Sequence, residues 1–527
     1  MEIIERSATD LARAIREGEL TSREVVEAHV DHARRVNPAL KAIAADRFEL
    51  ALAEADEADG RIGAARAAAA DPPRGGAAEG DPRAPAADPP RGGAAEREPR
   101  ASDALPPFLG VPCTIKESFA VQGMPNAAGL VHRADFRAEA DAPAVARLRA
   151  AGAIPIGVTN TSEATMWIES SNHLYGRTNN AYNPKRTAGG SSGGEGAAVG
   201  AGFAPIGLGT DIGGSIRLPA FFNGIFGHKP SPGVVPCSGH FPAPSGDGAS
   251  SRMLAAGPLA RRAEDLMPFV RAVAGRDDGD PITRDVELGD PATVSLEGLD
   301  VVLGEGASLF PVRGELRDAR ERAAGALAAA GANLRREDLK GMRRAVEYYL
   351  ATLSDSNEDL VEVFALDAAP ALPKVVLDTM RRRGPHTLPL ALLFALARAG
   401  DRMPTERTAK AIEAGKALTR ELEDVIGGGV LLHPPFPRVA PRHGGTIGRP
   451  WVLANAAVFN LTGMPVTQVP LGLGRSGLPV GVQVVGCRDQ DHVTIAVALE
   501  LERALGGWVP PHATAENPLA CFAGSRQ

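Results

Sequence analysis

The chain is poor in cysteine and in aromatic residues, and it has no long hydrophobic run. Four cysteines in 527 residues, with no CxxC pair, exclude a disulfide-rich scaffold and a zinc knuckle. No segment approaches the roughly 20 apolar residues that a membrane-spanning helix needs. The first residues, MEIIER, lack the basic and apolar regions of a secretory leader. We therefore expect a cytoplasmic protein with no stable membrane span.

An excess of positive charge is also missing. Lysine and arginine total 57 against 64 aspartate and glutamate residues, which gives a net charge of −7. This balance argues against a broad basic face that would bind nucleic acid. Hydrophobic residues make up 44% of the chain and charged residues 23%, so wholesale disorder is excluded as well. We expect a folded protein that does not bind nucleic acid.

Glycine and proline, by contrast, are abundant, and part of them lies in one low-complexity segment. The sequence DPPRGGAAE occurs at residues 71–79 and again at residues 88–96. The surrounding stretch, residues 61–105, has almost no large apolar side chains. Such a stretch cannot bury enough surface to offset the entropy lost on ordering it. We predict a disordered insertion over residues 61–105.

On both sides of this segment, the apolar pattern predicts regular structure. Residues 1–60 look helical, because Ser7 and Thr21 each begin a capping-box pattern. Asn37-Pro38 is expected to end the second helix. From residue 106 onward, short apolar runs alternate with helical patterns, which favours an α/β fold. Strands are predicted at 109–115, 154–158, 203–208, 299–303, 430–432, 466–471 and 480–485, and helices at 142–151, 314–330 and 491–505.

The remaining glycines are concentrated in one region. Residues 189–224 hold twelve of the 60 glycines and contain two serine-bearing turns, GGSSGGEG and GLGTDIGGSIRLPA. Glycine lets the backbone adopt positive φ and approach a ligand closely. A serine on such a turn would face converging N–H groups, which is the arrangement of an oxyanion hole. Tight structural turns are the alternative, but two serine turns, the second flanked by Asp211 and Arg217, favour a functional site.

Two other motifs compete for the same residues. Residues 189–193 satisfy G-x-S-x-G, the nucleophile elbow of α/β-hydrolases. That mechanism needs a later histidine base such as His443, yet nothing local marks any of the eleven histidines. A phosphate-binding loop is disfavoured, because GxxxxGK[ST] is absent and no GxGxxG opens a helix after a strand here.

The stretch from Gly189 to Pro232 resembles the signature of the amidase signature family, and VPCTIKESF at residues 111–119 resembles that family's lysine strand. The spacings agree too, since Ser191 lies 75 residues after Lys116 and 24 residues before Ser215. The resemblance continues through residues 257–260, 460–465 and 477–485. PAFFNGIFGHKPSPGVVP, residues 219–236, is most similar to the branch of fatty-acid-amide-hydrolase-2-like and bacterial amidases. The aminoacyl-tRNA amidotransferase A subunits typically have GLKPTYG there.

The resemblance implies a large mixed central sheet covered by helices on both faces. It also implies four parts: a helical segment (1–60) packing on the core, the insertion (61–105), a catalytic domain (106–512) and a C-terminal tail (513–527). The variable substrate-binding part of the catalytic domain would span about residues 265–440. Within it, the apolar stretch at residues 386–399 is expected to line an acyl pocket or to touch a membrane surface. An ordinary core-facing helix is the alternative.

The family's catalytic set is a Ser–cis-Ser–Lys triad. Carried over by motif, Ser215 is the nucleophile, Lys116 is the base, and Ser191, preceded by a cis peptide bond, relays the proton between them. A serine hydroxyl needs such a base, and a lysine, with an ordinary pKa of about 10.4, can act only if burial or nearby charge lowers that pKa. A surface ion pair with Glu117 is the alternative for Lys116. We expect activity to rise toward alkaline pH.

The resemblance also assigns supporting positions. The backbone N–H groups of four consecutive residues are expected to form the oxyanion hole: Ile212, Gly213, Gly214 and Ser215. Five further residues are expected to support the two loops: Gly190, Ser192, Thr210, Asp211 and Arg217. No metal or organic cofactor is required, and the sequence contains no HxxxH or HExxH ligand cluster.

These observations predict an amidohydrolase that cleaves a small-molecule linear amide through an acyl-enzyme intermediate. The alternative is an amidotransferase A-type subunit that supplies ammonia to a partner. A catalytically inactive binding protein is a third class, which the intact Lys116, Ser191 and Ser215 argue against. The sequence leaves monomer and homodimer open, and it does not identify the acyl or amine group.

Overall fold

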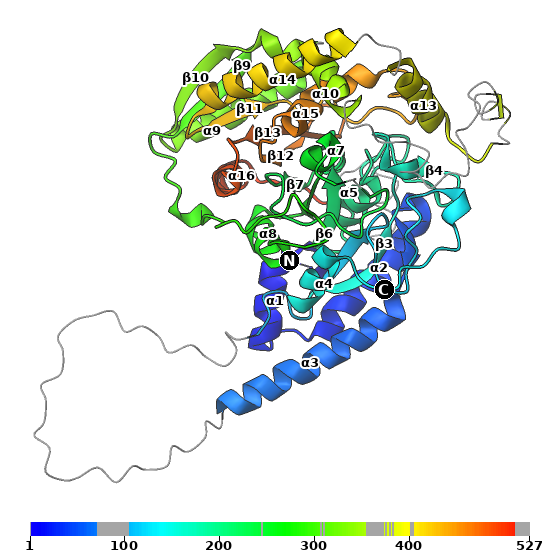
Figure 1. The fold of residues 1–527 in the computed structure, drawn as a ribbon. Coiled ribbons are helices and arrows are strands. Elements are labelled where there is room, and N and C mark those ends of the chain that lie inside the picture. Colours follow the sequence, from blue (N-terminus) through cyan, green and yellow to red (C-terminus); the bar gives the residue numbers. More distant parts are fainter. Residues whose placement is uncertain are drawn as a thin grey trace, which may run out of the picture.

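One mixed sheet of 11 strands organises the part of the chain that the structure describes (Figure 1). The structure is a computed structural model, and it describes residues 2–70, 105–243, 246–305, 308, 311–354, 374, 377–378, 381, 384–400 and 405–511. The strands, in their order across the sheet, are β1 (Ile43–Asp46), β3 (Ile154–Thr159), β2 (Pro112–Lys116), β6 (Ile206–Asp211), β8 (Ala255–Ala260), β7 (Phe226–Lys229), β12 (Val466–Leu473), β13 (Pro479–Val485), β11 (Val430–His433), β9 (Asp300–Glu305) and β10 (Asn333–Asp338). β4 (Ser171–Asn172) and β5 (Gly176–Arg177) form a separate ribbon.

The described helices lie before, between and after these strands. They are α1 (Ala8–Glu17), α2 (Ser22–Leu40), α3 (Phe48–Ala70), α4 (Pro143–Ala150), α5 (Gly193–Gly200), α6 (Arg217–Phe222), α7 (Ala249–Met253), α8 (Leu266–Val273), α9 (Gly314–Ala329), α10 (Ala345–Ser354), α13 (Leu388–Gly400), α14 (Thr405–Ile426), α15 (Ala454–Leu461) and α16 (Asp491–Leu505). The 3-10 turns are η1 (Ile3–Glu5), η3 (Val131–Arg133), η4 (Glu163–Thr165), η5 (Ala263–Asp265), η6 (Pro291–Thr293), η7 (Lys340–Arg344) and η8 (Pro450–Leu453). The predicted mixed sheet with helices on both faces is confirmed.

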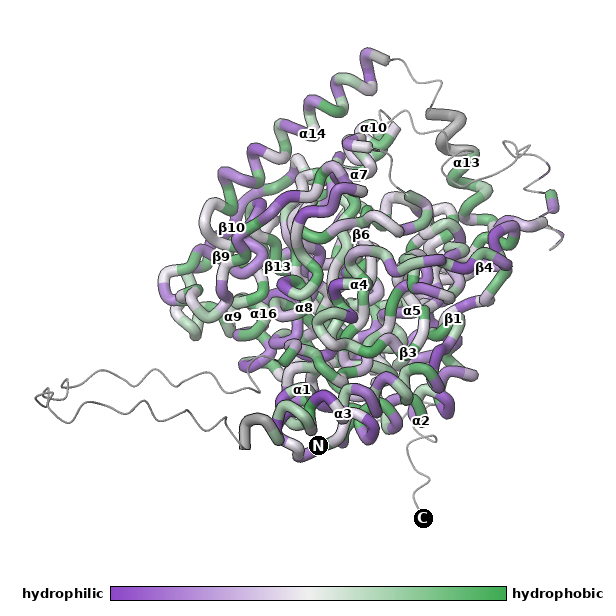
Figure 2. The backbone as a smooth tube through the Cα atoms, turned by 60° about the horizontal axis from the view of Figure 1, so that its bottom comes forward, coloured by the Kyte–Doolittle hydropathy of each residue, from purple (hydrophilic) through white to green (hydrophobic). Residues whose placement is uncertain are grey.

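Strand β9 shows why the sheet is buried on both faces. Val301 and Leu303 pack in the large core cluster that includes residues of α9, whereas Val302, between them, packs in a second cluster with residues of α10 and α14. Successive side chains of a strand point to opposite faces. Both faces of the sheet are therefore covered, and the strand is a continuous apolar run rather than an alternating one. Figure 2 shows α14 on the outside, with hydrophilic and hydrophobic residues alternating along it.

The N-terminal helices lie together at one end of the molecule (Figures 1 and 2). The predicted caps are present: the Ser7 hydroxyl accepts a hydrogen bond from the Asp10 N–H, and Thr21 forms a complete capping box with Glu24. Asp265, in the turn before α8, accepts hydrogen bonds from the N–H groups of Ala8 and Thr9. These hydrogen bonds hold the first turn of α1 against the segment before α8.

Two predicted boundaries in this region are wrong. Helix α2 continues through Pro38 to Leu40, because a proline inside a helix removes only one N–H and the buried Leu40 side chain still packs. Helix α3 runs to Ala70, so the boundary predicted at residue 61 falls inside it. Ile62 is buried, and the alanines that follow are strong helix formers. The repeated DPPRGGAAE segments and the tail (513–527) lie outside the described residues.

Three of the four cysteines lie in the described part of the chain, and all three are free thiols: Cys113, Cys237 and Cys487. Within the same residues, no helix combines the length and the apolar character that crossing a membrane requires. The seven predicted strands are present within a few residues as β2, β3, β6, β9, β11, β12 and β13. The apolar runs of the sequence do not predict β1, β4, β5, β7, β8 and β10.

Candidate active site

Two glycine-rich loops meet at the carboxyl ends of β2 and β6. These strands are parallel neighbours, so their last residues, Lys116 and Asp211, lie at the same edge of the sheet. One loop carries Ser191 and leads into α5, and the other carries Ser215 and leads into α6. Ser192 connects the loops, because its N–H donates to the Ser215 carbonyl (3.3 Å) and its hydroxyl donates to the Thr210 carbonyl (3.2 Å). The fold thus assembles the two serine turns that the sequence predicted.

Lys116 lies at the centre of this assembly and is fully buried. Its Nζ donates to the Ser191 hydroxyl at 2.6 Å and to the Thr210 hydroxyl at 2.7 Å. Burial lowers the pKa of Lys116 to about 7, although the carboxyl groups of Asp211, Glu195 and Glu117 act in the opposite direction. A buried lysine without a carboxylate in contact is a proton acceptor near neutral pH.

The alternative of a surface ion pair between Lys116 and Glu117 is wrong. The two residues are adjacent at the end of β2, and the Glu117 carboxyl accepts hydrogen bonds from the Ala127 N–H and from the Tyr175 hydroxyl, each at 2.7 Å. Glu117 is itself buried, and burial raises its pKa to about 7. Neither charge is exposed to solvent.

The backbone before Ser191 is held by its neighbours. The peptide bond between Gly190 and Ser191 is cis, as expected. The Ser191 carbonyl accepts hydrogen bonds from the hydroxyls of Thr161 and Ser170, both at 2.9 Å. A Cβ at Gly190 would lie only 2.6 Å from the Trp167 carbonyl oxygen, so no larger residue fits there.

The turn that carries Ser215 presents several backbone N–H groups. Among the described residues, the N–H groups of Ile212, Gly213 and Ser215 make no hydrogen bond, whereas the Gly214 N–H donates to the Asp211 carboxylate at 2.7 Å. The expected set of four oxyanion donors is therefore reduced to three, because Gly214 already has an acceptor. Ser215 is 7% exposed, and within the described chain its hydroxyl makes no hydrogen bond, including to Ser191.

A buried ion pair fixes the shape of this turn. Arg217 donates to both oxygens of Asp211 at 2.9 Å, and Asn460 donates to the Asp211 carboxylate at the same distance. The remaining Arg217 N–H groups donate to the Ala456 carbonyl and to the side-chain oxygens of Gln483 and Asn460. Burial alone would raise the pKa of Asp211, but the charge of Arg217 holds it well below its usual range. Asp211 in turn accepts hydrogen bonds from the Gly214 and Ile216 N–H groups, so the pair connects the end of β6 to the turn that carries Ser215.

Three residues at the site were missed in the sequence. Glu195 is fully buried in α5 and accepts hydrogen bonds from the Thr114 and Thr159 hydroxyls, and burial raises its pKa to about 8. His240 lies 3.3 Å from the Thr210 hydroxyl, and burial together with the Lys116 charge lowers its pKa to about 3. Tyr349 donates to the Ile212 carbonyl at 3.0 Å. Glu195 could have been noticed as the one charge within GGSSGGEG, but no local pattern marks His240 or Tyr349.

The other candidate chemistries find little support in the geometry. A nucleophile elbow needs a histidine base in contact with its serine. The His443 ring instead contacts the Pro184 carbonyl at 3.0 Å, and the Ser191 hydroxyl accepts a hydrogen bond from Lys116. Within the described ranges, no group of three histidine, cysteine, aspartate or glutamate residues could hold a metal ion.

Comparison with known proteins gives an independent view of the chain. A protein-family model described as amidase matches residues 91–495. The chain is 39% identical over 518 residues to fatty-acid amide hydrolase 2-B of Danio rerio, covering 96% of this chain and 90% of that protein. It is 28% identical over 539 residues to the A subunit of the glutamyl-tRNA(Gln) amidotransferase of Oleidesulfovibrio alaskensis, covering 96% and 98%. The solved structure of 6-aminohexanoate cyclic dimer hydrolase has a TM-score of 0.73 at 24% identity, covering 95% and 97%, which is a likeness of fold.

Breaking the Asp211–Arg217 pair tests whether it organises the loop. Arg217→Met leaves the Asp211 carboxylate buried without its cation, so we expect the free energy of unfolding to fall by about 3–5 kcal/mol in a urea titration. Arg503→Met, which removes an exposed arginine paired with Glu500, should leave unfolding unchanged.

Adding Asp211→Asn to Arg217→Met removes the uncompensated charge, so the double variant should be more stable than Arg217→Met alone. Equal stability of wild type and Arg217→Met would show that the pair does not hold the loop.

Proposed function

Because the chain belongs to the amidase signature family and is a hydrolase of carbon–nitrogen bonds other than peptide bonds, we propose that it hydrolyses long-chain fatty-acid amides with a Ser215–Ser191–Lys116 triad. The observation that carries the mechanism is the buried Lys116 amine, 2.6 Å from the Ser191 hydroxyl. The observation that supports the substrate class is the 39% identity to a fatty-acid amide hydrolase over 96% of the chain.

Lys116 starts the reaction as a neutral amine. It takes the Ser191 proton while Ser191 takes the Ser215 proton, and the Ser215 oxygen attacks the amide carbonyl. The contact between the two hydroxyls is not made in the free protein, and such catalytic hydrogen bonds often form only with substrate bound. The charge that develops on the carbonyl oxygen would be met by the N–H groups of Ile212, Gly213 and Ser215.

The second half of the reaction returns the protons. The ammonium of Lys116, acting through Ser191, protonates the leaving nitrogen as the carbon–nitrogen bond breaks, and an acyl ester remains on Ser215. Water, deprotonated by the same pair, then attacks the ester. The bond to the Ser215 oxygen breaks, the pair returns the proton to that oxygen, and the carboxylate is released. Thr210 accepts from Lys116 at 2.7 Å and fixes the amine toward Ser191 throughout.

Apolar side chains close to the oxyanion turn support a long acyl chain. Ile212, Leu353 and Leu453 are only partly buried, and they pack around Tyr349 and its neighbours. Apolar groups that remain partly exposed beside a reactive serine favour an apolar substrate. In the apolar stretch at residues 386–399, Leu390 and Phe394 of α13 are buried against Leu130 and Ala164, which favours the core-facing helix among the two alternatives for this stretch.

The amidotransferase alternative rests on the 28% identity to the A subunit of that enzyme. An amidotransferase component of this kind supplies ammonia to a partner, whereas a hydrolase acts on simple amides alone. Release of carboxylate and amine from an amide by the isolated chain therefore separates the two functions.

Three variants test the catalytic assignment on a fluorogenic amide. Ser215→Ala and Lys116→Met should each lower kcat/KM by about 10³-fold or more, because either change removes a component that acts as a unit with the others. Ser118→Ala is the matched control: this buried serine lies two residues from Lys116, and its hydroxyl has no hydrogen-bond partner among the described residues, so activity should be unchanged. Wild-type rates in Ser215→Ala would contradict the assignment.

Chain-length selectivity tests the substrate class. We expect kcat/KM for an 18-carbon primary amide to exceed that for acetamide by about 100-fold or more, since each methylene that enters an apolar pocket adds to transition-state binding. Leu453→Asn should reduce this advantage while leaving acetamide turnover unchanged. Equal or better turnover of acetamide by the wild type would rule out a long-chain preference without touching the triad.

A further inference from the structure

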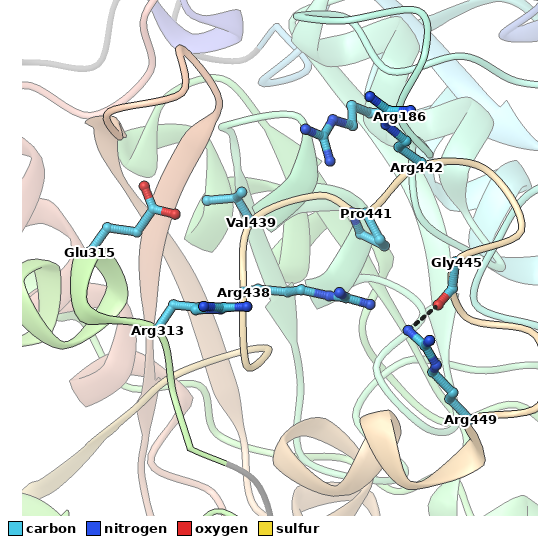
Figure 3. A pocket seen from close by; sticks show the side chains of 9 residues that line it. All are labelled: Arg186, Arg313, Glu315, Arg438, Val439, Pro441, Arg442, Gly445 and Arg449. Carbon is cyan, nitrogen blue, oxygen red and sulfur yellow. Dashed lines mark hydrogen bonds between the residues drawn. The ribbon is translucent and has the colours of Figure 1, made fainter.

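A cavity of about 490 Å³ outside the catalytic loops has a charged lining that is almost entirely positive (Figure 3). None of the three triad residues lines it. Its charged side chains are five arginines and one glutamate: Arg186, Arg313, Arg438, Arg442, Arg449 and Glu315. The whole chain carries a net charge of −7, so this concentration of positive charge is a local feature and not a general one.

The arginines come from three separate segments that backbone contacts hold together. Arg186 and Arg442 face each other across an isolated antiparallel bridge. The Thr187 N–H donates to the Pro441 carbonyl at 3.0 Å, and the Arg313 N–H donates to the Pro437 carbonyl at 2.9 Å. The cluster is therefore set by the fold and does not depend on contacts of the guanidinium groups.

In the part of the chain that the structure describes, these guanidinium groups have no carboxylate partner of the kind that many other arginines have. Among the described residues, none of the five lies within 4.0 Å of a carboxylate, although many other arginines form ion pairs. Within the described part of the chain, these guanidinium groups make two long hydrogen bonds of 3.3 Å, from Arg186 to the Ala440 carbonyl and from Arg449 to the Gly445 carbonyl.

Arg438 lies in the middle of the cluster and is only partly exposed. Burial lowers its pKa, and the charges of Arg449, Arg313 and Arg186 lower it further. Like charges gathered in a cavity repel each other and raise the local potential, which attracts an anion. The cluster is thus unfavourable on its own and would be stabilised by a negative ligand.

We propose that this cavity binds an anion of the phosphate class that carries two or more phosphate groups. A planar guanidinium group donates two parallel hydrogen bonds to the oxygens of one phosphate. The cavity has five guanidinium groups and only one carboxylate, Glu315, so a single phosphate group is too small to accept hydrogen bonds from all of them. The volume lies in the range of small-molecule sites. A soluble diphosphate and a lipid headgroup with several phosphates share this chemistry.

The cavity wall is continuous with the backbone around the catalytic serine turn. The Glu169 carboxylate accepts hydrogen bonds from the Gly444 and Thr446 N–H groups of the arginine-bearing loop. The Glu169 N–H, in turn, lies against Gly190, where a Cβ would approach it to 2.7 Å. An anion that bridges Arg186 and Arg442 therefore stabilises a loop that packs beside the Ser191 turn.

Calorimetric titration of the full chain with inorganic pyrophosphate tests the site. We expect binding that weakens as NaCl is raised from about 50 mM to about 500 mM, and a Kd for inorganic phosphate about 10-fold weaker than for pyrophosphate. Arg438→Gln and Arg442→Gln should each weaken pyrophosphate binding by about 10-fold or more. The control Arg276→Gln removes an exposed arginine that pairs with an exposed carboxylate 3.7 Å away, and it should bind like the wild type.

Thermal unfolding separates a lost site from a lost fold. Pyrophosphate should raise the Tm of the wild type and of Arg276→Gln but not that of Arg438→Gln. Without the anion, Arg438→Gln should unfold at the same temperature as the wild type or above it, because one repelling charge is gone. Absence of pyrophosphate binding to the wild type, or equal binding to Arg438→Gln, would overturn the proposal.

Vesicles identify the source of the anion. The chain is sedimented with phosphatidylcholine vesicles that contain a phosphatidylinositol bisphosphate. A lipid headgroup is the ligand if the wild type cosediments, pyrophosphate reverses this, and Arg438→Gln does not cosediment. Pyrophosphate binding without cosedimentation would identify a soluble ligand. Phosphatidylserine vesicles matched in charge are the control. If the wild type and Arg438→Gln both cosediment with them as well as with the bisphosphate vesicles, the cavity is not selective for phosphate groups.

Discussion

The site depends on one buried lysine amine whose partners are hydroxyl groups and which, among the described residues, contacts no carboxylate. Lys116 donates to Ser191 and Thr210, and burial brings its pKa to about 7. Three nearby carboxyl groups would restore its charge if they were ionised and unpaired. Burial raises the pKa of Glu195 to about 8 and of Glu117 to about 7, so each is partly or largely neutral near pH 7, while Arg217 neutralises Asp211. The surroundings thus favour a neutral lysine.

The same requirement explains the glycines and the buried ion pair. A Cβ at Gly207, within β6, would lie 1.9 Å from an oxygen of the buried Glu195, so this position of the strand has no room for a side chain. Asp211, held by Arg217, positions the Gly214 and Ile216 N–H groups and thereby the turn that carries Ser215. The pair stabilises the conformation of the loop. Because the Arg217 cation offsets the Asp211 charge, the carboxylate has less effect on the pKa of Lys116.

Much of this could be predicted from the sequence, and the failures have physical reasons. Apolar runs predicted the central strands, and the resemblance to the amidase signature predicted that the turns carrying Ser191 and Ser215 meet near Lys116. Strand β10 was missed because it is an edge strand with mostly polar, exposed residues. Local preference predicts a helix end at Pro38, but the buried Leu40 side chain packs in the core and α2 continues to it. His240, Tyr349 and the arginine cavity join segments far apart in the chain, which no local pattern reveals.

The central claim is that Lys116 is neutral near physiological pH and activates Ser215. The most direct measurement is the pH dependence of the second-order rate at which a fluorophosphonate inactivates the free enzyme by reacting with Ser215. Only the deprotonated amine can accept a proton, so the rate should rise with pH through a midpoint near 7. A midpoint near the ordinary lysine value of about 10.4, or a rate that falls as pH rises, would contradict the account.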